Sequence, residues 1–447
     1  MPSAERETRS FGRSAGLLSA GVGTSGVLTY AYFALAAHNL DADSYGQIVL
    51  LWSSVFLAIS IFYRPVEALL SRTIAERRAF GAEIGSALRV AATIQLSVAA
   101  GWAVLILALR GPLQDDLLAG SEGLYWVMFG SVIAFGASFY ARGYLAGRRR
   151  FALLAALLVC ESASRTSFAL AVALGIASGQ LAIALGIVAA PLFSLLVVPL
   201  AFTRRVADDP VGAPVAGQGE VSLATGGRFA SAVLIVMLSE QVFLNSPPLI
   251  GGFESDATAG YIFNILMIAR APLLVFQGVS TSLLPHLTRM RARGATGDDA
   301  FRLSVNTTLR AIAVFAAVVL VIVAIAGPAL MQIAFSDKFE YDRVGLLLVT
   351  AGMGLYLAAT TLNQAALAQG RARDAAVRWA ACAATFLLWS LLPWLEFDRR
   401  IEIGFLGAAI ALTASLAILY RRASEPGVQP GSIEELEAQL ATADEAS

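Results

Sequence analysis

The sequence predicts an all-α integral membrane protein of about twelve transmembrane helices, arranged as two six-helix bundles related by a parallel repeat. Three observations lead to this prediction: the excess of apolar residues, the length and number of the apolar runs, and the distribution of arginine between them. Of 447 residues, 57% are hydrophobic and only 14% are charged, and the mean hydropathy is +0.70. Soluble domains are about a quarter charged, so the apolar excess of this chain must face lipid.

Twelve apolar runs are long enough to be transmembrane helices. About twenty helical residues, each rising about 1.5 Å, cross the roughly 30 Å of hydrocarbon in a bilayer. The runs lie near residues 15–37, 45–70, 88–109, 123–145, 151–176, 179–202, 229–252, 258–282, 309–332, 344–367, 375–395 and 401–420. The first run follows arginines as a signal peptide does, but it is too long for a signal-peptide core and further runs follow it.

Arginine is concentrated in alternate loops, as the positive-inside rule requires of cytoplasmic segments. The chain has 32 Lys and Arg residues, of which Lys338 is the only lysine. With the N-terminus inside, 24 arginines fall on inner segments and five basic residues fall on outer segments. A miscounted helix would exchange the two sides in every later loop, and no such reversal occurs. The pattern therefore predicts that both termini are cytoplasmic.

The chain divides in the stretch 204–225, which is rich in Gly, Pro and Ala and has no apolar period. We expect this stretch to be a cytoplasmic linker between an N-terminal six-helix lobe at 1–203 and a C-terminal six-helix lobe at 226–422. The segment 423–447 is acidic and contains no basic residue, which predicts a disordered cytoplasmic tail.

The two halves share a weak sequence repeat with one constant offset. This offset relates Gly46 to Gly260 and Ser25 to Ser239, and it superimposes the first apolar run on the seventh. Each half has an even number of spans, so the repeat is parallel and its axis lies along the membrane normal. Two such bundles leave a cavity between them, which is the architecture of an alternating-access transporter.

Ionisable residues near mid-membrane, where each charge costs about 2.5–3.5 kcal/mol or more, are candidates for function. Glu161 and Arg165 are four residues apart in one run with the acid first, the favourable order for a salt bridge. Glu240 and Arg270 are each fifteen residues from the turn near 255, so we expect them to lie at equal depth and to pair. Each pair either joins helices or offers its arginine to an anionic substrate, and both alternatives stay open.

The seventh run adds neutral polar residues beside Glu240, and it contains two successive prolines. Such an interrupted helix is typical of cavity-lining elements in repeat transporters. By contrast, Arg64 and Arg142 lie towards cytoplasmic helix ends, where we expect them to reach lipid phosphates. The candidate substrate-binding residues are therefore Arg270, Arg165, Glu240, Glu161, Gln241 and Asn245.

Several activities are disfavoured by the sequence. It contains no Walker A motif, so it does not hydrolyse ATP by a P-loop. Its two cysteines and two histidines cannot complete a zinc site of usual spacing, and we expect no metal and no cofactor. Asp41 and Asp43 could form the acid pair of a membrane glycosyltransferase, but the short outer loops leave no acceptor site. We therefore expect a protein that is not an enzyme.

Several short motifs resemble those of a known family. Asn39-Leu-Asp-Ala-Asp-Ser-Tyr-Gly46, followed by an apolar run and Leu69-Leu70-Ser71-Arg72, resembles the start of the polysaccharide flippases. These flippases belong to the multidrug/oligosaccharidyl-lipid/polysaccharide exporter superfamily. The second half is similar to them at Asn245-Ser246-Pro247, Ala259-Gly260-Tyr261, Arg270-Ala271-Pro272 and Leu283-Leu284-Pro285. The resemblance implies two lobes around a cationic central cavity, with Arg270 as a contact to the anionic head of the substrate.

The function implied by this resemblance is a flippase in the bacterial plasma membrane that moves a polyprenyl-pyrophosphate-linked oligosaccharide by alternating access. Its partners would be that lipid-linked saccharide, membrane lipids and polysaccharide-assembly proteins. No nucleic acid is expected, because the net charge is zero. The alternative is an ion-coupled multidrug-type exporter of the same superfamily. A membrane glycosyltransferase or polymerase is a third alternative.

Overall fold

A computed structural model describes residues 2–79, 81, 83–203, 223–271, 295–339, 341–393 and 395–422. These residues form helices and connecting loops, and no strand occurs among them. Almost all of the expected linker 204–225, the tail 423–447 and the Leu283-Leu284 motif lie outside the described residues.

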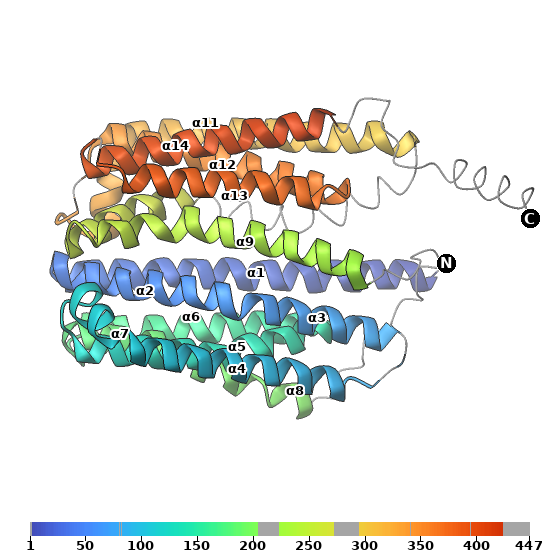
Figure 1. The fold of residues 1–447 in the computed structure, drawn as a ribbon, viewed down its shortest axis with the longest axis horizontal. Helices are drawn as coiled ribbons and strands as arrows, with labels where there is room; N and C mark the ends of the chain where they lie inside the picture. The colour runs from blue at the N-terminus through green and yellow to red at the C-terminus, as the bar shows by residue number, and fades with distance from the viewer. Residues whose placement is uncertain are drawn as a thin grey trace, which may run out of the picture.

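The N-terminal half forms one lobe of long helices that run parallel to the long axis of the molecule (Figure 1). The second span is interrupted at Tyr63, because Pro65 lacks the N–H that would continue the helical hydrogen bonds. The helices are α1 (Pro2–Asn39), α2 (Ala42–Phe62), α3 (Arg64–Ala79), α4 (Gly85–Ala108), α5 (Glu122–Gly147), α6 (Phe151–Ala173), α7 (Gly179–Ser194) and α8 (Leu200–Thr203), with a π-helical turn at Pro112–Leu117 and a 3-10 turn at Leu195–Val197.

The C-terminal half forms the second lobe. Its helices are α9 (Leu223–Gly251), a helix at 256–271, α11 (Ala295–Phe335), α12 (Arg343–Ala368), α13 (Ala372–Leu391) and α14 (Phe397–Arg422). Ten helices in the described part of the chain are long and apolar enough to cross a membrane. Two further spans were predicted. The described residues cover only 256–271 of the first, and the second is α13, which carries charges in its first half. The all-α membrane fold predicted from the sequence is confirmed.

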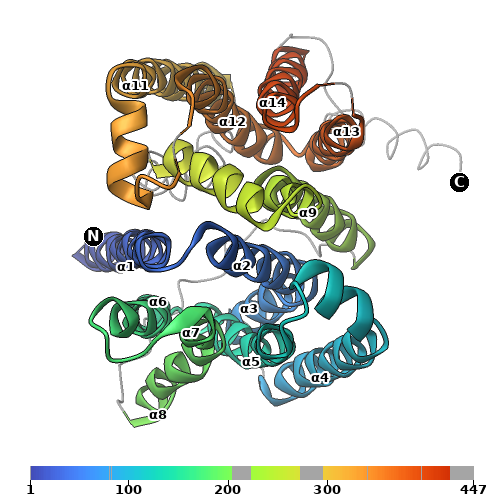
Figure 2. The ribbon, with the colours of Figure 1, turned by 90° about the vertical axis from the view of Figure 1, so that its left-hand side faces the viewer.

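Helices pack within each lobe, and the two lobes lie side by side. In the N-lobe, α6 packs on α1 and α7, and α5 packs on α3 and α7. In the C-lobe, α12 packs on α11 and α14, and α13 packs on α9 and α14. The lobes meet where α1 and α2 contact the helix at 256–271 and where α2 packs on α9, and α2 and α9 lie side by side in the end-on view of Figure 2. The start of α1 and the end of α14 lie at the same end of the molecule (Figure 1), which we call the inner end following the arginine distribution.

The helix caps carry the repeat more clearly than the sequence does. The carboxylate of Asp41 accepts a hydrogen bond from the Ser44 amide at the start of α2, and this bond lowers the pKa of Asp41. The hydroxyl of Ser255 accepts the equivalent bond from the Thr258 amide, at the position that the sequence repeat relates to Asp41. The helix at 256–271 is therefore the repeat of α2.

Later helices keep the repeat with a slightly longer offset. Ser121 caps α5 and Asp342 caps α12, each through its side chain and the amide three residues ahead. Both helices end in a left-handed residue, Arg149 with φ 56° and Gly370 with φ 75°. The two hydrogen bonds that close these helix ends, from residues 149 and 150 in one lobe and 370 and 371 in the other, are equivalent.

Candidate functional site

The acid of α6 pairs with a different arginine from the one that the sequence predicted. Glu161, only 5% exposed, accepts a hydrogen bond at 2.5 Å from the Nη2 atom of Arg142 on α5 and one at 3.1 Å from the Ser138 hydroxyl. The Arg142 guanidinium also lies over the Phe139 ring, 4.5 Å from its centroid. The expected salt bridge with Arg165 is therefore wrong, as is the expected contact of Arg142 with lipid phosphate. Two packed helices direct these side chains towards each other, and spacing along one helix does not reveal that.

Arg165 is left with aromatic and hydroxyl partners. Its guanidinium lies 4.3 Å from the centroid of Trp52 and 5.6 Å from that of Tyr32, and its Nη2 donates to the Thr29 hydroxyl at 2.8 Å. Among the described residues, its Nε and Nη1 atoms have no hydrogen-bond partner, although Arg165 is only 2% exposed. A planar guanidinium with two free donors is suited to an oxyanion, provided that α1 moves enough to admit it.

Arg270 bonds a backbone carbonyl of α9 and does not pair with Glu240. Its Nη2 atom donates a hydrogen bond to the backbone carbonyl of Leu244. Pro248 lies four residues after Leu244 and has no N–H, so this carbonyl lacks its helical donor. The predicted ion pair with Glu240 is therefore wrong. The arginine supplies the hydrogen bond that Pro248 cannot give. The sequence argument, which used only the distance of each charge from the turn, could not reveal this bond.

We expect replacement of Pro248 by alanine to separate the stability of α9 from its function. The new N–H can bond the Leu244 carbonyl and displace Arg270, while removal of an interior proline stabilises the helix by up to about 3 kcal/mol. Thermal unfolding in detergent should therefore occur at a higher temperature while transport falls. Pro247→Ala is the matched control. The N–H that it adds would bond the carbonyl of Phe243, four residues earlier, and not the Leu244 carbonyl that Arg270 bonds. Equal effects of the two changes on transport would contradict the assignment.

Glu240 is influenced by a charge from the other lobe. Its carboxylate interacts electrostatically with Arg64, at the start of α3. Arg64 also acts on Glu67, one turn further along α3, and both Glu240 and Arg64 act on Tyr356 of α12. Arg64 thus lies among buried charges between the lobes. The sequence analysis had instead expected it to reach a lipid headgroup.

The polar residues after Glu240 face each other within the C-lobe. The amide of Asn245 donates to the Gln241 carbonyl oxygen at 2.8 Å, and both side chains are buried. Their assignment as substrate contacts stays a prediction. Sequence reasoning missed Glu67 and undervalued Arg64, although Pro65 beside them marks the break between α2 and α3.

The outer ends of the lobes are joined by a seam. The Gln47 side chain donates to the Asp256 carboxylate at 2.9 Å, and the buried Tyr45 hydroxyl donates to Asn264. A Cβ on Gly46 would overlap the backbone of Asp256, so the two repeat-related helices touch main chain to main chain.

Two basic residues at the outer end, Lys338 and Arg399, make structural contacts, although the sequence analysis had treated them only as loop charges. Lys338 donates to the carbonyl of Leu40 across the lobes at 2.9 Å. Arg399 pairs at 2.7 Å with Glu402, which is only 1% exposed and also accepts a hydrogen bond from Tyr341. Burial is the main cause that raises the pKa of Tyr341 above its usual range.

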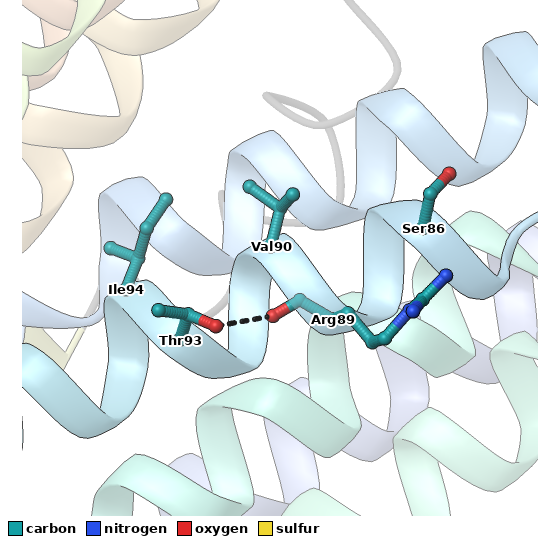
Figure 3. Close-up of a pocket in the computed structure, with 5 residues that line it drawn as sticks. All are labelled: Ser86, Arg89, Val90, Thr93 and Ile94. Carbon is teal, nitrogen blue, oxygen red and sulfur yellow. Dashed lines mark hydrogen bonds between the residues drawn. The ribbon is translucent and has the colours of Figure 1, made fainter.

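An open groove on α4 contains none of these charges. It is lined by Ser86, Arg89, Val90, Thr93 and Ile94, and Ser86, Val90 and Ile94 project from the same side of the helix (Figure 3). Val90 is 57% exposed, as expected of a side chain that faces lipid. The groove is therefore separate from the candidate site.

Comparison with known proteins places the fold. No family model and no curated protein sequence matches the chain. Among solved structures, it is similar to an inward-facing multidrug resistance MATE transporter of the MOP superfamily, with TM-score 0.71 and 12% identity over 90% of this chain and 96% of that one. An outward-facing MATE transporter gives TM-score 0.60 and 16% identity over 92% and 95%.

A third similar structure is a MOP superfamily transporter from Pyrococcus furiosus, described as having a binding pocket of reverse polarity that suggests a different function. Its TM-score is 0.55, with 13% identity over 92% of this chain and 96% of that one. At these identities the similarity shows the fold, which is that of MATE transporters. The polysaccharide flippase family that the sequence motifs resemble is not confirmed by these comparisons.

Proposed function

We propose that this chain is a multidrug-type exporter of the MOP superfamily that moves small amphipathic molecules by alternating access. The proposal rests above all on the seam, which joins the two repeat-related lobes at the outer end while buried charges from both lobes lie deeper in the molecule. This arrangement corresponds to an inward-facing state. The higher TM-score with the inward-facing transporter supports the same assignment.

The charges between and within the lobes favour an acidic cargo. Four arginines lie among the buried charges and are opposed by three glutamates. They are Arg64, Arg142, Arg165 and Arg270, against Glu67, Glu161 and Glu240. Since guanidinium groups stay protonated in proteins, this interior keeps an excess of positive charge. It attracts an amphipathic anion more strongly than the cations expected of an acidic cavity.

A second candidate is the polyprenyl-pyrophosphate-linked saccharide that the sequence motifs suggest, with polysaccharide-assembly proteins as partners. The free donors of Arg165 support this candidate, because a pyrophosphate provides several oxyanions for bidentate bonds. In either case the protein would act in the plasma membrane of a bacterium, with its inner end in the cytoplasm.

Transport into inside-out vesicles distinguishes these candidates. Purified protein is reconstituted, and uptake of three probes is measured under an imposed proton or sodium gradient: a lipophilic cation, an amphipathic carboxylate, and a short-chain polyprenyl-pyrophosphate saccharide. We expect gradient-dependent uptake of the carboxylate, reduced about tenfold by Arg165→Gln. Arg110→Gln is the matched control, because Arg110 is exposed and pairs with Glu122 at the outer end. Uptake of only the lipid-linked probe would select the second candidate, and uptake of only the cation would refute the charge argument.

A further inference from the structure

Arg64 lies at a break between two helical segments. α2 ends at Phe62 and α3 begins at Arg64, and Pro65 follows directly. The first segment packs on α9 of the other lobe, whereas the second packs on α5 of its own lobe. Arg64 is therefore placed where the chain of the N-lobe leaves the surface of the C-lobe.

The register of α2 against α9 puts Arg64 at the depth of Glu240. A Cβ on Gly252, directly after α9, would contact the Leu50 side chain at 2.6 Å, which fixes the two antiparallel helices relative to each other. Arg64 is fourteen residues beyond Leu50, and fourteen residues before Gly252 is Leu238. Both paths descend about 21 Å at 1.5 Å per residue. Arg64 and Glu240 thus lie at about the same level of the lobe interface, well inward of the seam.

These two charges interact but do not touch. Within the described part of the chain, neither side chain has a hydrogen bond or an ion pair within 4.0 Å, and each is half-buried. The carboxylate of Glu67 on α3 likewise has no direct side-chain partner among the described residues. Arg64 is therefore shared between an acid of its own lobe and an acid of the opposite lobe.

We propose that Arg64 and Glu240 form a direct ion pair when the outer seam opens, and that this pair closes the cavity towards the cytoplasm. The inference rests on the alternating access proposed above. If the lobes rock about their interface, separation at the seam brings their deeper parts together. Arg64 then moves from the neighbourhood of Glu67 onto Glu240, and both charges gain a partner in a low-dielectric environment.

Paired cysteines test the movement without any cargo. Cys160 and Cys382 are first replaced by alanine, and Arg64→Cys is combined with Glu240→Cys. Disulfide formation requires Cα atoms about 4.4–6.8 Å apart. We expect rapid oxidation when the seam is held open by Gly46→Leu. In the parent background, in which Gly46 keeps the seam closed, oxidation should be at least about tenfold slower. Equal rates in both backgrounds would overturn the proposal, and they would do so even if no probe is transported.

Charge exchange identifies the partner of Arg64. Arg64→Glu alone should lower transport of whichever probe the vesicles accept by about tenfold or more, because it places like charges beside each other. Adding Glu240→Arg should restore transport, whereas adding Glu67→Arg should not. Rescue by the Glu67 exchange alone would show that Arg64 serves only its own lobe and would overturn the proposal. Failure of every wild-type transport assay would instead refute the proposed function and leave the disulfide rates to decide the pairing.

Discussion

A protein carrying Gly46→Leu should lose the closed outer seam and transport very little. Gly46 lies against the backbone of Asp256. An added side chain would overlap main-chain atoms, which cannot relieve the clash by a change of rotamer. Overpacking a well-packed contact costs about 1–3 kcal/mol and more when the backbone must move. Each 1.4 kcal/mol, roughly, shifts an equilibrium tenfold, so the population with a closed seam should fall at least about tenfold relative to the population with an open seam.

The seam can be probed directly from outside the cell. Leu50 is buried against Gly252, so a cysteine at position 50 should react slowly with an impermeant thiol reagent in the parent and quickly in the Gly46→Leu protein. Gly101→Leu is the matched control, because a Cβ at that position on α4 has open space around it. Gly260→Ala should have an intermediate effect, since its Cβ meets the side chain of Tyr45 at 2.9 Å and no backbone atom. Unchanged labelling and transport in Gly46→Leu would rule out this contact as the closing element.

Removing the charge of Glu161 should destabilise the N-lobe strongly. The carboxylate bonds Arg142 directly and also acts on Arg165, so Glu161→Gln removes the negative charge that both buried arginines share. Breaking a buried ion pair from one side costs about 3–5 kcal/mol. We expect a large fall in the unfolding temperature and in the amount of protein in the membrane. Glu122→Gln is the control, because that acid is exposed and its loss should change stability by about 1 kcal/mol at most.

Reciprocal exchange separates the two possible partners of Glu161. Glu161→Arg combined with Arg142→Glu keeps opposite charges on α6 and α5 and should recover much of the lost stability. Glu161→Arg combined with Arg165→Glu places the acid beside Trp52 and Tyr32, so this exchange should not recover the lost stability. The pairing would be wrong if the second exchange recovered more stability than the first.

Hydropathy and arginine placement were enough to predict the architecture, because both follow from the bilayer itself. Lipid demands long apolar helices, and the membrane sides differ in how much positive charge they accept. Even the repeat was visible, since Gly46 and Gly260 occupy equivalent positions near the seam. The break at Tyr63 was not anticipated, although Pro65 provides a local reason for it.

Partners of the buried charges were harder to predict, because each depends on neighbours that are distant in sequence. Glu161 and Arg165 satisfy the spacing rule for a salt bridge, yet α5 supplies a better-placed arginine. For Arg270 a usable signal did exist: Pro248 removes the helical donor to the Leu244 carbonyl, so a donor from another helix was required. A buried carbonyl that has lost its helical donor to a proline therefore helps to predict the partner of a nearby arginine.

The repeat relates helices whose electrical character differs. With the offset that relates the caps of α5 and α12, Arg142 of α5 corresponds to Asn363 of α12, and Glu161 of α6 corresponds to Cys382 of α13. The ion pair that anchors one lobe is thus replaced by neutral residues in the other. The two lobes are therefore alike in backbone and unlike in buried charge at these positions, so the effect of a substitution in one lobe does not predict the effect at its counterpart.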